Sequence, residues 1–351
     1  MYLKSLSLQN FRSYKKAHLD FDPRTLIVGP NTSGKTNIIE AITLLTNGKS
    51  FKTDKDIQML HYGESVGRVK GQTGETELEV VLTSGEVEGK ITPAKKYLVN
   101  GVSKRRIDFT GNLVSISFSP LDLQVVIGSP SMRRHFLDEV LEQTDFDYRV
   151  ALAEYEKGIR QRNSLLELAR KMGGRDIKQF EYWDNLVIKY GSVLTEKREK
   201  LVEYMNEKTK DIFEFAVIYD KSIISYDRLL EYQEEEFLSG VTLVGPHRDD
   251  LIFDMFDEGT STAKDIKLYG SRGQQRLTIL QLKLLQLLYI EEKKNVSPLL
   301  LLDDIFSELD EKHIIHVLQM LGNRESVITT THMEFVPAEF KKGIKVIELK
   351  K

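Results

Sequence analysis

The chain has 351 residues with no cysteine, and its 50 basic and 53 acidic side chains give it a formal net charge of −3. A chain of this length fits about two domains, each with its own hydrophobic core. The lack of cysteine excludes disulfides and thiolate metal sites, and it is compatible with a reducing cytoplasm. The balanced charge excludes a protein that is basic throughout, so any contact with nucleic acid has to come from local patches.

The apolar residues indicate neither a signal peptide nor a membrane-spanning segment. The opening stretch "MYLKSLSLQNFRSY" alternates polar and apolar residues instead of forming an apolar block. The longest aliphatic run, "LLLL" at 299–302, is far shorter than the roughly 20 residues that cross a bilayer. We therefore predict a soluble, cytoplasmic protein without a membrane partner.

The first third of the chain has the alternation of β-strands. Residues 2–8 and 15–21 alternate, and the apolar run "TLIVG" that follows predicts a buried strand. Residues 65–118 predict further short strands, among them a hairpin with a type I′ turn at Asn100 and Gly101.

The middle of the chain changes to long, charged, helix-favouring stretches. Between about 130 and 215 we expect two antiparallel helices joined by a turn at Gly173 and Gly174, with Gly191 as an interruption of the second helix. No heptad pattern is sustained there, which argues against a long coiled coil.

Strands and helices alternate again towards the end of the chain. The expected elements are short strands from about 217, then a helix, a buried strand, a helix and two strands at 272–294, 298–303, 310–321, 325–330 and 343–349. We predict an α/β fold in which one domain is divided into 1–118 and 240–351, with a mainly helical domain, 119–239, inserted between the halves.

A phosphate-binding loop follows the strand "TLIVG". Its sequence "GPNTSGKT" matches G-x-x-x-x-G-K-[ST] and lies between a predicted strand and a predicted helix, which is the context that this motif requires. Backbone amides and the helix N-terminus would bind phosphate, Lys35 would neutralise its charge, and the Thr36 hydroxyl would bind Mg²⁺. The candidate nucleotide-binding residues are Gly29, Pro30, Asn31, Thr32, Ser33, Gly34, Lys35 and Thr36.

Two aspartates end the buried strand in "PLLLLDDIFSELD". The carboxyl ends of strands are where α/β sheets place their ligand sites. Asp303 would hold Mg²⁺, and Asp304 would orient the attacking water near the γ-phosphate. The same pair is also typical of an acidic turn in which both aspartates cap a helix.

The stretch "YGSRGQQRL" begins the predicted helix at 272–294. Free amides at the helix start, together with Gly270, Ser271 and Gly273, would form an anion site that needs no lysine. Taken by itself, the stretch favours an ordinary helix cap made by Ser271 over an anion site.

Two single residues and three basic clusters are weaker candidates. His332, which follows the strand in "VITTTH", could sense the γ-phosphate, and Arg12 in "LQNFRSY" could offer a fork of donors to a phosphate. Each is also typical of a structural residue. The pairs and triplets at 104–106, 133–134 and 341–342 allow contact with a DNA backbone and are equally typical of a solvated surface.

The order of these motifs resembles an ABC-type ATPase of the SMC-like repair class. Over essentially the whole chain, "FSPLDLQVVIGSPSMRRHFLD", "TLVGPHRDDL", "YGSRGQQR" and "LLLLDDIFSELD" resemble the RecF family of bacterial recombination mediators. The resemblance implies an ABC-type ATPase head with a mixed sheet, an antiparallel β subdomain and an inserted helical domain. It implies ATP and Mg²⁺ as ligands, with slow, DNA-stimulated hydrolysis. It also implies sequence-independent binding to double-stranded and gapped DNA, an ATP-dependent homodimer, and work with RecR, RecO and RecA at gaps and stalled forks.

The resemblance also implies roles for individual residues. In a head-to-tail dimer, the signature motif of one subunit would contact the γ-phosphate held by the partner's Lys35. That motif comprises Ser271, Arg272, Gly273, Gln274 and Gln275. Asp303 and Gln124 would be metal ligands with Thr36; Lys35, Asp304 and His332 would act in hydrolysis; Arg12 would lie near the phosphates, and Asp310 in the loop that crosses between subunits.

Two positions depart from common patterns. Thr32 occupies a position where this family often has glycine, and we expect it to require an ordinary negative φ and so to alter the turn slightly. Asp304 is shorter than the glutamate of transporters, which fits slow hydrolysis.

Two other functions are compatible with a phosphate-binding loop, a transport ATPase and an SMC-like tether. The long spacing between Lys35 and Ser271 argues against the first, and the missing heptads argue against the second.

Overall fold

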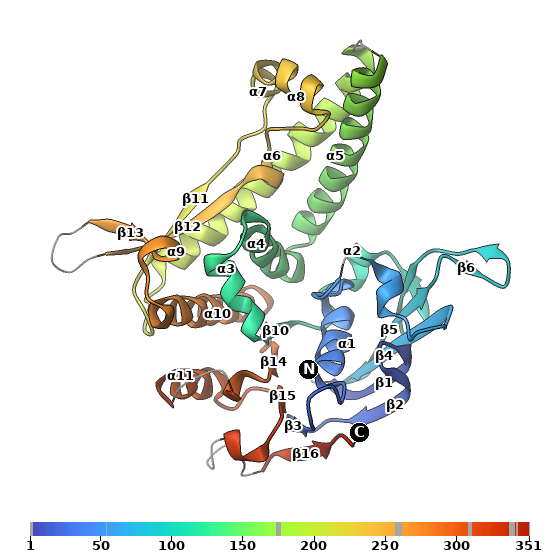
Figure 1. The fold of residues 1–351 in the computed structure, drawn as a ribbon, viewed down its shortest axis with the longest axis vertical. Coiled ribbons are helices and arrows are strands. Elements are labelled where there is room, and N and C mark those ends of the chain that lie inside the picture. The colour runs from blue at the N-terminus through green and yellow to red at the C-terminus, as the bar shows by residue number, and fades with distance from the viewer. Residues whose placement is uncertain are drawn as a thin grey trace. The chain divides into compact units, whose positions relative to one another are not determined.

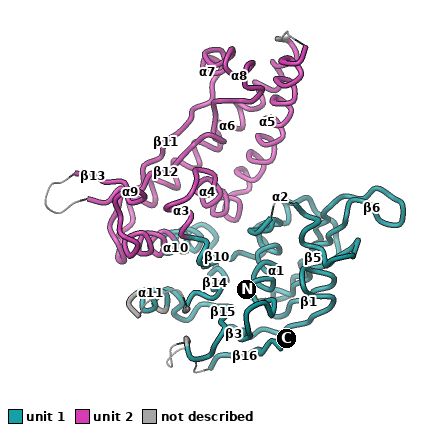
Figure 2. Tube along the Cα trace, in the orientation of Figure 1, with its two compact units in different colours: residues 1–122, 283–351 teal, residues 123–282 magenta. Residues whose placement is uncertain are grey.

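The computed structural model describes residues 3–53, 55–172, 177–256, 262–307, 311–336, 341 and 343–350. Its contacts divide the chain into two compact units (Figure 2). Unit 1 comprises residues 1–122 and 283–351, and unit 2 comprises residues 123–282. Residues 240–282, which we expected in the divided domain, therefore cluster with the helical segment, and the domain bounds predicted from the sequence stay a prediction.

The core of unit 1 is formed by two large sheets and the helix α1 between them (Figure 1). One sheet is antiparallel and has the order β2-β1-β4-β5-β8-β9, and the other is parallel and has the order β10-β14-β15-β3-β16. The elements are β1 (Leu3–Phe11), β2 (Tyr14–Asp20), β3 (Arg24–Val28), α1 (Lys35–Asn47), β4 (Val66–Thr73), β5 (Thr76–Thr83), β6 (Glu86–Val87), β7 (Lys90–Ile91), β8 (Lys95–Val99), β9 (Val102–Lys104), α2 (Arg106–Phe109), β10 (Ser115–Phe118), β14 (Leu299–Asp303), α11 (Glu311–Leu321), β15 (Ser326–Thr330) and β16 (Lys345–Glu348).

The core of unit 1 explains why α1 is apolar on most of its surface. Ile38, Ile42 and Leu45 of this helix are fully buried, in one cluster with side chains of both sheets. A helix that packs against a sheet on either side has little surface left for water. The strands β3 and β14 contain continuous apolar runs because both of their faces are covered. This packing fixes the N-terminus of α1 at the edge of the parallel sheet.

The predicted hairpin between β8 and β9 is confirmed. Val99 pairs with Val102, and the two residues between them, Asn100 and Gly101, have φ values of 50° and 76°. Positive φ at both central positions defines the type I′ turn, which asparagine and glycine adopt most readily.

Unit 2 combines helices with a small antiparallel sheet, β11-β12-β13. Its elements are α3 (Leu123–Ile127), α4 (Pro130–Thr144), α5 (Phe146–Met172), α6 (Ile177–Glu207), β11 (Ala216–Asp220), α7 (Tyr226–Glu231), α8 (Gln233–Ser239), β12 (Asp250–Phe256), β13 (Ala263–Asp265) and α9 (Ile266–Tyr269). The helix α10 (Arg272–Lys294) begins in unit 2 and ends in unit 1. Its bounds are those expected from the sequence.

Helices α5 and α6 form the expected antiparallel pair, although the turn at Gly173 and Gly174 lies outside the described residues. The expectation that Gly191 interrupts the second helix is wrong, because α6 continues through it. A Cβ at this position would lie 2.6 Å from Cγ2 of Ile224 and 3.0 Å from the ring of Tyr155. Glycine is therefore there for close packing and not to end the helix.

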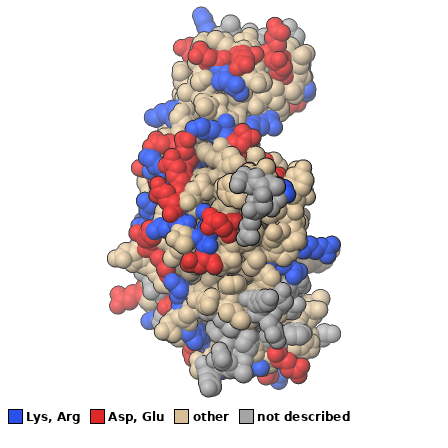
Figure 3. All heavy atoms as spheres, turned by 90° about the vertical axis from the view of Figure 1, so that its left-hand side faces the viewer, with Lys and Arg blue, Asp and Glu red and all other residues tan. Residues whose placement is uncertain are grey.

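At least one face of the molecule mixes charges of both signs. On the face shown in Figure 3, lysine and arginine are interspersed with aspartate and glutamate. On the antiparallel sheet of unit 1, Arg68 pairs with Glu79 at 2.6 Å and Lys70 with Glu77 at 2.7 Å. Among the helices in the described ranges, none combines the length and apolarity needed to cross a membrane.

Candidate nucleotide-binding site

The phosphate loop lies between β3 and α1, as the motif predicts. Gly34 precedes the helix with a φ of 97°, and a Cβ there would lie 2.6 Å from the hydroxyl of Tyr14. Both observations require glycine. The first amides of α1 have no acceptor within the helix, so they are available to an anion. The Lys35 ammonium donates to the carbonyls of Gly29, at 2.8 Å, and Pro30, at 3.2 Å.

Thr32 corrects one expectation. It has a φ of 71°, in the left-handed region that glycine adopts freely, although we expected an ordinary negative φ. A β-branched residue in this region is an outlier that costs roughly 1–2 kcal/mol. The loop therefore keeps its turn and carries local strain.

Two oxygen ligands suitable for Mg²⁺ lie beside the loop. The Thr36 hydroxyl is 3.3 Å from Oδ1 of Asp303, and the Thr329 hydroxyl donates to the same oxygen at 2.7 Å. Hydroxyl and carboxylate oxygens are the hard ligands that Mg²⁺ prefers, so these residues fit the ion. Among the described residues, no group of three carboxylate or histidine side chains is arranged to hold a metal ion by itself. Phosphate oxygens and water would have to complete the coordination.

The strand order explains why these residues meet. Strands β14, β15 and β3 are parallel neighbours, so their carboxyl ends share one edge of the sheet. Asp303 ends β14, and the phosphate loop follows β3. Parallel α/β sheets bind ligands at this edge.

Asp304 and His332 lie at the same edge, after β14 and β15. Asp304 has a φ of 53°, and its amide donates to the Thr329 carbonyl at 3.2 Å and to the Thr329 hydroxyl at 3.0 Å. His332 is exposed, and its carbonyl accepts from Thr330 at 3.1 Å. The structure thus brings both residues to the edge that holds Asp303.

Arg12 directs its donors at a helix of its own unit. Its Nε and Nη2 donate to the two carboxylate oxygens of Glu40 at 2.9 and 2.6 Å, and its Nη1 donates to the Gln58 carbonyl at 2.6 Å. Glu40 lies on α1 and is completely buried. Arg12 is therefore engaged in a bidentate ion pair next to the loop, and its contact with phosphate stays a prediction.

The signature motif forms the start of α10. The Ser271 hydroxyl accepts from the Gln274 amide at 3.3 Å, and the Gln274 side chain accepts from the Ser271 amide at 2.8 Å. This reciprocal pair is a capping box. The Gln275 side chain donates to the Ile266 carbonyl at 3.2 Å and so connects the helix start to α9. Arg272 and Gly273 form the first turn.

The structure does not place two of the predicted site residues, Gln124 and Asp310, at the phosphate loop. Gln124 is exposed on α3 and belongs to unit 2, as does the signature motif, whereas the phosphate loop and Asp303 belong to unit 1. Asp310 lies outside the described residues. The roles of both residues stay predictions.

Comparisons with known proteins agree with this arrangement. Residues 2–351 match the family model described as the RecF/RecN/SMC N-terminal domain. The chain is 36% identical over 352 residues to the DNA replication and repair protein RecF of Moorella thermoacetica, with 96% of this chain and 91% of that protein covered. It is 33% identical to the RecF protein of Rippkaea orientalis, with 99% and 98% covered.

The chain belongs to the RecF family. A solved structure described as the recombination mediator protein RecF-ATP in the RecFOR pathway superposes with a TM-score of 0.83 at 29% identity. That match covers 96% of this chain and 93% of the other. The ABC-type ATPase fold expected from the sequence is confirmed.

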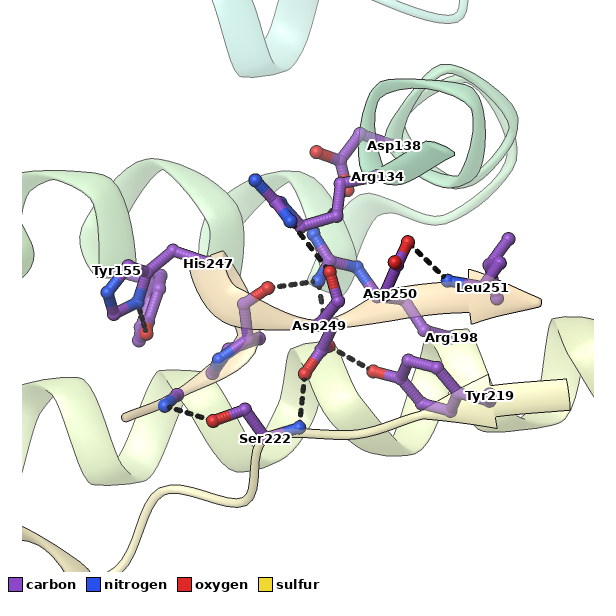
Figure 4. A network of polar contacts seen from close by, with 12 residues as sticks. Arg134, Asp138, Tyr155, Arg198, Tyr219, Ser222, His247, Asp249, Asp250 and Leu251 are labelled. Carbon is purple, nitrogen blue, oxygen red and sulfur yellow. Dashed lines mark hydrogen bonds and ion pairs between the residues drawn. The ribbon is translucent and has the colours of Figure 1, made fainter. Parts of the chain in front are cut away.

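The stretch "GPHRDD", which carried much of the resemblance to the RecF family, forms a buried polar network in unit 2 (Figure 4). The Asp249 carboxylate accepts from Nη1 of Arg198 at 3.0 Å, from the Ser222 amide at 2.7 Å and from the Tyr219 hydroxyl. Burial raises the pKa of Asp249, and these donors act in the opposite direction. Arg198 also donates to Asp138 at 2.7 Å, which joins α4 and α6 to the start of β12.

The basic pair Arg133 and Arg134 belongs to the same network. Arg133 pairs with Asp250 at 2.6 Å and is 3% exposed, and Arg134 donates to the Asp249 carbonyl at 2.6 Å. Arg133 is therefore committed to the fold of unit 2, whereas Arg134 is half-buried and its contact with DNA stays a prediction.

Three residues near the phosphate loop, Lys52, Glu40 and Tyr14, were not predicted from the sequence. Lys52 donates to the Asn37 side chain at 3.1 Å, and burial lowers the pKa of Lys52 while the carboxylates of Glu40 and Asp303 raise it. Burial raises the pKa of Tyr14, whose ring covers Gly34, to about 12. The only signal in the sequence was the short distance of these residues from the loop.

Proposed function

We propose that this protein is an ATP-dependent DNA-binding ATPase of recombinational repair. The observation that carries the proposal is the pair of Thr36 and Asp303, 3.3 Å apart at the phosphate loop, in a chain whose second anion-binding motif begins α10. Relatives named DNA replication and repair protein RecF, and a solved RecF-ATP structure, support it.

Binding of ATP would use the described contacts of the loop. The loop amides and the positive end of α1 would hold the phosphates, and the Lys35 ammonium would exchange the carbonyls of Gly29 and Pro30 for phosphate oxygens. Thr36 and Asp303 would hold Mg²⁺, which neutralises charge that develops during phosphoryl transfer. Asp304 would orient the attacking water, with His332 beside it.

The signature motif would act on a second copy of the chain. Ser271 and Gly273 lie at a helix N-terminus, where amides and dipole favour an anion but no lysine is present. In a head-to-tail dimer this helix start would bind the γ-phosphate held by the partner's Lys35. ATP would then drive dimerisation by its differential affinity for the dimer, and slow hydrolysis would release it.

DNA would be bound through its backbone, without sequence preference. The mixed charge in Figure 3 favours local contacts over a broad basic field. We propose double-stranded and gapped DNA as ligands and RecR as the protein partner, with RecO and RecA acting through RecR. The support is the description of a similar structure as a recombination mediator in the RecFOR pathway.

Two variants test the proposal by analytical ultracentrifugation with ATP and Mg²⁺. Ser271→Arg should bind ATP as a monomer and lose ATP-dependent dimerisation, because a bulky cation replaces the hydroxyl at the helix start. Lys35→Met should lose ATP binding itself. Normal dimerisation of Ser271→Arg would contradict the proposed head-to-tail arrangement.

The DNA part of the proposal has its own measurement. Affinity for duplex, gapped and single-stranded DNA is determined at several salt concentrations with and without ATP. Backbone binding predicts a linear fall of log affinity with log salt and higher affinity with ATP. Salt-independent binding, or no binding, would contradict it.

A further inference from the structure

A cavity of about 740 Å³ opens in unit 2 beside the start of α10. One wall is the segment between α6 and β11, with Lys210 and Phe213. The other walls come from β12, β13 and the residues before α10, with Phe256, Lys264 and Tyr269. The volume lies within the range of small-molecule sites, about 300–1,000 Å³.

Aromatic rings give the cavity flat apolar surfaces. Tyr269 is 67% exposed and Phe256 is 58% exposed, although large aromatic side chains are usually mostly buried. Phe213 also lines the cavity, and its ring is stacked at 6.4 Å from that of Phe215. Exposed rings around one hollow favour a planar ligand that can stack on them.

A buried ammonium group gives the cavity a preference for an anion. The Lys210 side chain is 3% exposed, and its nitrogen lies 5.6 Å from the centre of the Phe215 ring. Its nearest carboxylate is that of Glu214, at 3.8 Å, on a side chain that is 72% exposed. A cation withdrawn from water and paired this loosely is stabilised by a nearby anion. Asp211 and Glu214 in the same wall offer acceptors for hydroxyl or amino groups.

Gln274 connects the cavity to the signature motif. It lines the cavity, and its side chain accepts from the Ser271 amide at 2.8 Å. A ligand with an anionic end at the start of α10 would therefore have its other end beside this hollow. A planar ring, hydroxyl groups and phosphates are the parts of a nucleotide.

We propose that this cavity receives the base and ribose of the ATP held on the phosphate loop of a second copy of the chain. The inference rests on the proposed head-to-tail dimer and extends it, because each nucleotide would be read at both ends by the opposing subunit. Tyr269 would stack on the base, and Lys210 would face the ribose and the adjacent phosphate.

Photolabelling with 2-azido-ATP tests the placement of the base directly. In the wild-type dimer, we expect label on peptides that contain 210–214 or 255–269. In Ser271→Arg, which stays monomeric, this label should disappear while ATP remains bound. A dimer labelled only in unit 1 would overturn the cavity proposal and leave the dimer intact. Label that persists in the Ser271→Arg monomer would also overturn it, because the base would then come from the same chain.

Failure of the proposed function gives a different result. If ATP does not dimerise the wild-type protein at all, the head-to-tail model fails, and this inference fails with it. If label goes to the cavity only when DNA carrying a photoreactive base replaces 2-azido-ATP, the cavity binds a DNA base, and the proposal for ATP is wrong.

Substitution of Tyr269 measures the contribution of stacking. Tyr269→Ala should raise the ATP concentration for half-maximal dimerisation about tenfold, because one stacked ring is lost. ATP affinity of the monomer should not change, and Tyr269→Phe should restore dimerisation. Tyr226→Ala is the matched control, since Tyr226 is 59% exposed in the same unit and lies outside the cavity. Unchanged dimerisation of Tyr269→Ala would contradict the stacking role.

Discussion

Thr32 shows how one residue stores strain in the phosphate loop. With a φ of 71°, this β-branched side chain holds a conformation that glycine adopts freely. Thr32→Gly should therefore raise the free energy of unfolding by up to about 1 kcal/mol, because relief of strain exceeds the added backbone entropy of the unfolded chain. Thermal unfolding measures the change.

The control for this prediction is Thr32→Ala, which keeps a β-carbon in the left-handed region. It should gain less stability than Thr32→Gly. A Thr32→Gly protein that unfolds at a lower temperature than the wild type would show that the threonine makes a compensating contact.

The environment of His247 should make the free energy of unfolding depend on pH. Its Nδ1 accepts from the Tyr155 hydroxyl at 2.7 Å, and Nε2 donates to the Thr242 carbonyl at 3.0 Å, so the fold holds the neutral ring. Burial lowers the pKa of His247 to about 4. The unfolded chain takes up the proton more readily, so this contribution is complete above about pH 6.5 and is lost as the pH falls towards 4, by up to roughly 3 kcal/mol.

Urea unfolding of the wild type and His247→Gln at pH 7.5 and pH 5 measures this contribution. The stability advantage of the wild type over the variant should shrink at pH 5. His135→Gln removes an exposed imidazole from α4 and is the control. An advantage that is equal at both pH values would contradict the prediction.

At the scale of elements, a buried arginine joins α5, α6 and α8. Arg162 is fully buried and pairs with Asp184 at 2.6 Å and with Glu236, also fully buried, at 2.7 Å. Arg162→Met should cost about 3–5 kcal/mol, because it leaves carboxylates in the interior without their cation. Denaturant unfolding of the variant tests this.

Arg160 on the same helix is the matched control. Its side chain is 68% exposed, and its nearest carboxylate, that of Glu156, is 4.0 Å away. Arg160→Met should change stability by no more than about 0.5 kcal/mol, as is usual for surface sites. Equal effects of the two substitutions would show that the buried network does not hold the helices together.

At the scale of the whole molecule, ATP should stabilise one unit more than the other. The units have separate cores, and the phosphate loop belongs to unit 1. ATP with Mg²⁺ at a hundred times its dissociation constant should stabilise the folded protein by about 2.7 kcal/mol. In the Ser271→Arg monomer, where no partner contributes, ATP should increase protection from hydrogen exchange more in unit 1 than in unit 2.

The control is Lys35→Met, which should show no change with ATP. Equal protection of the unit 2 core in the monomer would indicate that the two units unfold together. Protection of Lys35→Met by ATP would contradict the role of the loop.

Much of the fold and of the site follows from patterns within short stretches. The alternation of β1 and β2, the apolar run of β14 and the bounds of α10 reflect periodicities that each element needs to bury one face. The phosphate loop is equally local, because its amides, lysine and threonine are neighbours in the chain. The exceptions were Gly191, whose role depends on packing against Ile224 and Tyr155, and Thr32, whose left-handed conformation the residue type does not predict.

The sequence by itself determined the family, the phosphate loop and the kind of chemistry, because these depend on residues that are adjacent in the chain. The resemblance predicted that some distant side chains share a site, and the tertiary structure decided which of them meet and why. Thr36 and Asp303 are 267 positions apart and come within 3.3 Å because β3 and β14 share a sheet edge. Packing between separate elements likewise creates the ion pair of Arg12 with Glu40 and the cavity lined by Lys210 and Tyr269.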